Sequence, residues 1–279
     1  MMAMDLVMLR VAAALYFVAT VAALSAIASR QALPERLLRW VLWAAVGLHA
    51  ASFVSRSTTA GYLAVANFGE TLSFLGLVLV VAFLVMQRRL PVLALSAVVV
   101  PLAFGLTLAA TALKGGVRPL PPTLHSVWLP VHVGLAILGD AFLALACSAS
   151  VLYLVQDRRL KAHRAGGAQP HLPSLETLDR LSHRSVVWGL VLLTLAILTG
   201  IVWAHEAWGE PHSQPWVLDP KLLFTVGVWA FYVVLLQGRM AAGWRGRFAA
   251  QLTIAGFAVI VLSLVGVNVL GLGMHGRAY

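Results

Sequence analysis

Eight long apolar segments constrain this chain more than any other feature of its sequence. Each has about the 20 residues that a helix needs to cross the hydrocarbon core of a bilayer. The segments are continuous, unlike the short alternating strands of an outer-membrane barrel. The sequence therefore predicts an all-α polytopic membrane bundle of about eight transmembrane helices. The predicted spans are roughly 6–28, 37–56, 70–87, 91–113, 128–155, 184–205, 220–238 and 249–272.

The composition excludes the main soluble alternatives. Of the 279 residues, 61% are hydrophobic and 11% are charged, whereas a soluble domain carries about 25% charged residues. A cytosolic enzyme of this size could not bury so much apolar surface. The single cysteine, Cys147, excludes a disulfide scaffold within the chain. We therefore expect residues 1–279 to form one integral membrane domain in a lipid bilayer.

The distribution of basic residues predicts the orientation of this bundle. Fourteen of the 20 Lys and Arg residues lie around the connections that follow the first, third, fifth and seventh spans, and six lie elsewhere. Since basic loops remain in the cytoplasm, both termini are predicted on the outer, periplasmic side of a bacterial inner membrane. The longest cytoplasmic loop would be about 157–183. The same bias accounts for the net charge of +10, so we expect no nucleic-acid partner.

This topology brings several histidines toward the outer side. His132 begins the fifth span, two residues after Pro130, and His275 lies just beyond the eighth span. Both would lie at the outer edge of the bilayer on different helices, where they could approach one ligand. The histidines predicted on or toward the outer side are His49, His125, His132, His205, His212 and His275.

The outer loop at about 206–221 is rich in tryptophan. Trp208 and Trp216 lie within this loop, and Asp219-Pro220-Lys221 ends it. One interpretation is an interfacial aromatic belt. The other is a platform for a flat aromatic ligand, with Lys221 meeting a carboxylate. Haem fits the second interpretation, because it combines a flat apolar ring, two propionates and an iron that takes axial imidazoles.

The segment Gly200-Ile-Val-Trp-Ala-His-Glu-Ala-Trp208-Gly209, followed by Trp216-Val-Leu-Asp219-Pro220-Lys221, is similar to the tryptophan-rich "WWD" segment of cytochrome c assembly proteins of the CcsA/CcmC type. Other stretches resemble the same family in the same order. The resemblance covers about residues 37–276 and also extends to the smaller HemX/YpjD-like branch. The further stretches are 67–74, 124–133, 243–247 and 266–276.

The resemblance implies which residues would hold haem b. His132 and His275 would be the axial ligands of the iron, and their nitrogens would then lie about 4 Å apart. Lys221 would meet a propionate. The tryptophan-rich segment would flank the ring through Trp208, Gly209, Trp216, Asp219 and Pro220. Weaker candidates are His49, His205 and His212.

The resemblance also implies the function. The protein would hold haem at the outer face and present it for attachment to apocytochrome c, with a partner assembly subunit that carries an outer soluble domain. We expect no catalytic residue in this chain, so that any haem-attachment activity would belong to the complex.

Two alternatives remain open. The HemX-like branch implies a membrane regulator of haem biosynthesis that acts through the cytoplasmic loop. A small transporter could instead use His49 and Asp140, since intramembrane ionisable residues are usually functional. Asp140 lies about 80° around the helix from His132, so it need not face the same site. Glu70, at the edge of the third span, is predicted to be a structural cap.

Overall fold

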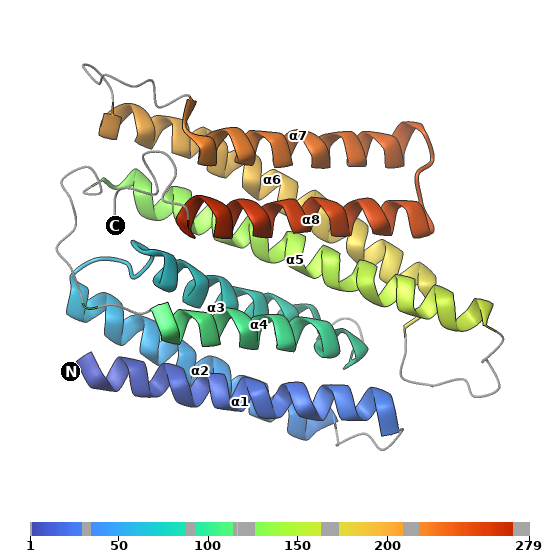
Figure 1. Cartoon of the computed structure of the whole chain (residues 1–279), viewed down its shortest axis with the longest axis horizontal. Coiled ribbons are helices and arrows are strands. Elements are labelled where there is room, and N and C mark those ends of the chain that lie inside the picture. The colour runs from blue at the N-terminus through green and yellow to red at the C-terminus, as the bar shows by residue number, and fades with distance from the viewer. Residues whose placement is uncertain are drawn as a thin grey trace.

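The computed structural model describes residues 2–29, 35–87, 93–113, 116, 126–162, 173–208 and 218–269. The described part of the chain contains eight α-helices and no β-strand (Figure 1). All eight are long and apolar enough to cross a membrane, which confirms the predicted fold class. The helices are α1 (Met2–Ser29), α2 (Glu35–Ala60), α3 (Phe68–Gln87), α4 (Leu93–Leu113), α5 (Trp128–Lys161), α6 (Leu175–Trp208), α7 (Pro220–Ala241) and α8 (Gly246–Val269).

The helices form two groups that meet along α5. In the first group α1 packs on α2 and α4, and α3 packs on α4. In the second, α5 and α6 cross the molecule together and α7 and α8 cover them on one side (Figure 1). Helix α5 also contacts α3 and α4, so it joins the two groups. The start of α1 and the end of α8 lie at the same end of the bundle (Figure 1), which we call the outer end after the charge prediction.

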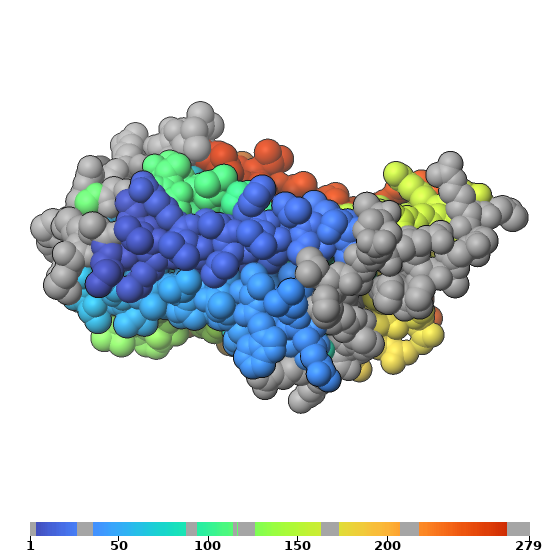
Figure 2. Space-filling model, turned by 90° about the horizontal axis from the view of Figure 1, so that it is seen from below, coloured from blue at the N-terminus to red at the C-terminus, as the bar shows by residue number. Residues whose placement is uncertain are grey.

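The face formed by α1 and α2 is apolar, as a lipid-facing surface requires. These two helices lie side by side along its length (Figure 2). Val7, Phe17 and Val18 on α1 and Trp40 on α2 are all exposed. Because half or more of each of these side chains remains exposed, burial in lipid accounts for them.

Glycines allow α5 and α6 to approach closely. A Cβ at Gly139 would lie 3.2 Å from the carbonyl oxygen of Gly189, and a Cβ at Gly189 would lie 2.8 Å from Leu143. Small residues at such crossings let helix backbones pack directly in a membrane. This contact holds α5 and α6 against one another about two helical turns along α5 from His132.

Two predicted loops are shorter in the structure. Helix α5 continues to Lys161 and α6 begins at Leu175, within the predicted cytoplasmic loop 157–183. The early start of α6 has a local cause, because the Ser174 hydroxyl accepts a hydrogen bond from the Thr177 amide at 3.2 Å and caps the helix. The outer loop predicted at 206–221 also shortens, since α6 reaches Trp208 and α7 begins at Pro220.

The stretch 243–247 includes most of the turn between α7 and α8 and the first two residues of α8. Gly243 and Gly246 have φ values of +68° and +64°, which L-residues with a side chain rarely adopt. The ring of Trp244 lies against Gly238, in the space that a Cβ there would need. Arg239 also donates a 2.8 Å hydrogen bond to Asp179 of α6. This family-like stretch therefore has a structural role at the inner end.

Candidate functional site

A cavity of about 190 Å³ lies among α5, α6, α7 and α8, toward the outer end. The 61–67 loop and the first turn of α3 close one side of it. Most of its lining is Leu, Ile, Val and Ala, with a few polar side chains among them. The ionisable residues that line it are His132, Asp140 and Lys221, and its hydroxyl-bearing residues are Thr71, Thr225 and Ser263.

His132 lies in this cavity with a defined tautomer. Its Nδ1 is 2.8 Å from the carbonyl oxygen of Ala196. A carbonyl can only accept, so Nδ1–H is the donor, and the neutral imidazole carries its lone pair on Nε2. Histidines that ligate metals usually have their other ring nitrogen fixed by a carbonyl or carboxylate in this way. The imidazole is thus prepared to bind a metal through Nε2.

Two residues of α6 shape the space around the His132 ring. A Cβ at Gly200 would lie 2.7 Å from both Cε1 and Nδ1 of His132, so only glycine leaves room for the ring there. Trp203 stacks on it with ring centroids 6.1 Å apart and planes 12° apart. Sequence reasoning missed these roles. The available signal was Gly200-x-x-Trp203 inside the family-like segment.

Asp219, Pro220 and Lys221 form the start of α7. The Asp219 carboxylate accepts from the Lys221 amide at 2.9 Å and caps the helix, and Pro220 occupies the first helical position, where it needs no amide partner. Asp219 is buried. This local structure directs the start of α7 so that Lys221 lines the cavity.

Asp140 lines the same cavity as His132. The expectation that it need not face that site is therefore corrected. Two side chains separated by about 80° around a helix can both reach a wide cavity. This cavity is wide enough to be lined by residues of five helices, α3 and α5 to α8.

His49 lies elsewhere, between α1, α2 and α3. It is fully buried, with Nε2 2.9 Å from the Ser73 hydroxyl and Nδ1 3.4 Å from the Tyr16 hydroxyl. His49 does not line the cavity that contains His132, as far as the described residues define it. The structure therefore does not bring His49 together with His132 or with Asp140, and a haem-binding role for His49 stays a prediction.

Of the other residues predicted to bind haem, only some lie in the part of the chain that the structure describes. His205 is exposed on the last turn of α6 and does not line the described cavity. Trp208 is the last residue of α6. Gly209, His212, Trp216 and His275 lie outside the described residues. The shared iron between His132 and His275 therefore stays a prediction.

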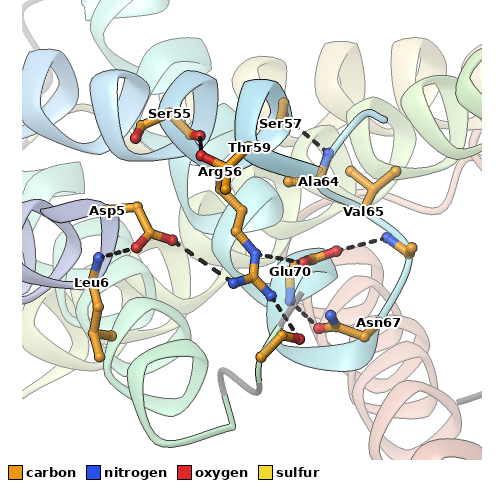
Figure 3. Close-up of polar contacts among 12 residues, drawn as sticks. Asp5, Leu6, Ser55, Arg56, Ser57, Thr59, Ala64, Val65, Asn67 and Glu70 are labelled. Carbon is orange, nitrogen blue, oxygen red and sulfur yellow. Dashed lines mark hydrogen bonds and ion pairs between the residues drawn. The ribbon is translucent and has the colours of Figure 1, made fainter. Parts of the chain in front are cut away.

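A buried charge cluster holds the loop before α3, whose residues Ala66 and Asn67 line the cavity. Figure 3 shows the contacts of this cluster. Glu70 accepts from Arg56 Nε at 2.9 Å and from the Ala66 amide at 3.0 Å, and Arg56 Nη1 lies 3.9 Å from Asp5. The Glu70 amide donates to Asn67 Oδ1 at 2.9 Å. This is close to a capping box, so the predicted capping role of Glu70 is confirmed. Sequence reasoning missed Arg56 and Asp5, which lie on separate helices.

Comparison with known proteins adds to this geometry. A sequence profile described as Cytochrome C assembly protein matches residues 65–275. The chain belongs to the cytochrome c assembly protein family. The matched region contains every described residue that lines the cavity.

Curated members of the cytochrome c assembly family agree over most of the chain. Cytochrome c biogenesis protein CcsA of Synechococcus sp. (strain CC9605) is 31% identical, covering 87% of this chain and 87% of the relative. CcsA of Prochlorococcus marinus subsp. pastoris is 33% identical, covering 82% and 79%. The resemblance predicted from the tryptophan-rich segment is confirmed. These relatives do not favour the HemX-like regulator or the small transporter.

Proposed function

We propose that this membrane protein handles haem for cytochrome c maturation, and that it holds the haem in the cavity beside His132. The observation that carries the proposal is the His132 imidazole. Its Nδ1–H is bound to Ala196, and its ring lines an apolar cavity that also contains an ammonium group. Family membership supports the proposal, since the relatives are cytochrome c biogenesis proteins.

The residues present fit haem as the cargo. His132 would bind the iron through Nε2, and His275 would supply the second imidazole from beyond α8. Trp203 would keep the His132 ring in place by stacking, and Lys221 would pair with a propionate. In this proposal the cavity would enclose only part of the ring, and the tryptophan-rich segment that contains Trp216 would flank the rest.

Apocytochrome c, the protein that would receive the haem, needs access to the exposed part of the ring. In this proposal the cargo is haem b, whose vinyl groups accept the two thiols of a Cys-x-x-Cys-His segment in apocytochrome c. This chain would orient the ring and hold it, while a partner assembly subunit with an outer soluble domain would bind the client. The site would face the periplasm of a bacterial inner membrane, as the charge distribution predicts.

Reporter maturation tests the proposal. The protein and its natural partner subunit are expressed with a reporter apocytochrome c in a host that lacks its own assembly proteins, and covalent haem in the reporter is measured by haem staining. We expect holocytochrome c with the wild-type chain and at most about a hundredth as much with His132→Ala, given the usual weight of one metal ligand.

Gly134→Ala is the matched control, because it lies half a turn away on α5 and a Cβ there meets open space. We expect Gly134→Ala to mature the reporter like the wild type. Equal maturation by His132→Ala, or none by the wild type, would contradict the proposed function.

A further inference from the structure

The cavity contains two opposite charges that do not neutralise each other by contact. Asp140 and Lys221 both line it. Within the described part of the chain, neither side chain forms an ion pair or hydrogen bond with another residue. A carboxylate inside a membrane protein is costly. Its presence in a cavity suggests that it acts on whatever occupies the cavity.

Asp140 lies deeper than the proposed iron ligand. It follows His132 by eight residues on α5, which is about 12 Å along a helix. It is also next to Gly139, where α5 contacts Gly189 of α6. Asp140 therefore marks the inner end of the cavity.

Lys221 lies near the level of His132. The Trp229 indole of α7 donates to the Thr194 hydroxyl of α6 at 2.8 Å, which sets the two helices side by side. Lys221 is eight residues outward of Trp229, and Gly200, which touches His132, is six residues outward of Thr194. Lys221 is thus at about the level of His132 along the bundle, and Asp140 is deeper.

We infer that Asp140 limits the affinity of the cavity for haem, so that the haem can be released to its acceptor. This inference rests on the proposed function. Haem carries two propionates, so Lys221 attracts it and Asp140 repels it. Because the cavity is largely apolar, both effects are stronger than they would be in water. A carrier that must pass its cargo on needs a moderate affinity, and an internal like charge provides it.

Titration with two porphyrins tests this inference. Purified protein in nanodiscs is titrated with haem b and with haem dimethyl ester, which has no carboxylates, and binding is followed by the Soret absorption. With both porphyrins kept ferrous, so that the ester is uncharged, we expect Asp140→Asn to lower the dissociation constant for haem about tenfold and to leave that for the dimethyl ester unchanged. Lys221→Met should raise the constant for haem and also spare the ester.

Asp157→Asn is the matched control, because it removes a carboxylate from the same helix outside the cavity, where Asp157 pairs with Lys161. In the reporter assay we expect Asp140→Asn to bind haem more tightly yet mature cytochrome c more slowly. Asp140→Ser is a second neutral variant, in case Asp140→Asn does not fold.

Three results would overturn the inference: unchanged or weaker haem binding by both neutral variants, an equal shift with the dimethyl ester, or faster maturation. Suppose that the wild type, Asp140→Asn and Asp140→Ser each bind haem and haem dimethyl ester equally well. Only this inference would then fail, and the proposed function would stand. If the wild type bound neither porphyrin, the proposed function would fail, and this inference with it.

Discussion

The two groups of helices differ in what their interior polar residues contact. In one group these residues pair with each other, and in the other they line a cavity. In the α1–α3 region, Arg56 lies between Glu70 and Asp5, and His49 lies between two hydroxyls. Around α5–α8, His132, Asp140 and Lys221 line a cavity. The comparison teaches that a polar residue within a membrane bundle is not a site by itself. What distinguishes a site is that its polar groups face a space that a ligand can occupy.

Loss of the buried cation in the first region should have the largest effect. Arg56→Met would leave the buried carboxylates of Glu70 and Asp5 without their counter-ion. Removing one partner of such a pair costs about 3–5 kcal/mol. We expect this loss in the free energy of unfolding, measured by denaturant titration in detergent. Lys221→Met makes the same change at the cavity and should cost less than about 1 kcal/mol; equal losses would contradict the comparison.

Replacing His132 and His49 in turn should separate haem binding from stability. We expect His132→Ala to weaken haem binding by at least about 100-fold, because it removes an iron ligand. His49→Ala should leave haem binding in the cavity unchanged and instead lower stability, since Ser73 and Tyr16 lose a hydrogen-bond partner. Haem titration and unfolding of both variants provide the measurements. The opposite pattern would show that the site lies near His49.

A single methyl group should disturb the iron site. In Gly200→Ala the new Cβ would lie 2.7 Å from the His132 ring, and overpacking of this kind costs about 1–3 kcal/mol. The ring can move to relieve it, so we expect about tenfold weaker haem binding and a shifted Soret band. Gly134→Ala, which meets open space, should change neither. A normal spectrum for Gly200→Ala would show that the His132 orientation is not needed.

The helix cap beside the cavity should have the smallest effect. Asn67→Ala removes the acceptor for the Glu70 amide, and losing an N-cap costs about 1 kcal/mol. Asn67→Ser keeps a capping oxygen and should cost less. Thermal unfolding of both variants gives the comparison. A loss from Asn67→Ala as large as that from Arg56→Met would mean that Asn67 has a role beyond capping.

The fold could be predicted from the sequence because each membrane helix is recognisable from its own residues, without reference to the rest of the chain. Each span is a continuous apolar run, and the family-like tryptophan-rich segment lies within one stretch of chain. His132 and Lys221 could be chosen for the same reason, since each belongs to a recognisable segment.

What the sequence left out depends on contacts between distant helices. Arg56 on α2 pairs with Asp5 on α1 and Glu70 on α3. The spacing of these residues in the sequence gives no sign that they are in contact. The need for glycine at position 200 arises from the ring of His132 on another helix. Helical angle alone could not place Asp140, because the width of the cavity decides which residues line it.

A structure of the haem-loaded protein tests the central claim most directly. Electron cryomicroscopy of the wild type in nanodiscs with haem b would locate the macrocycle. We predict that it lies among α5, α6, α7 and α8, with iron bonded to Nε2 of His132 and the Nδ1–H of that ring still bound to Ala196. A macrocycle bound at His49 between α1 and α3, with the cavity beside His132 empty, would contradict the account.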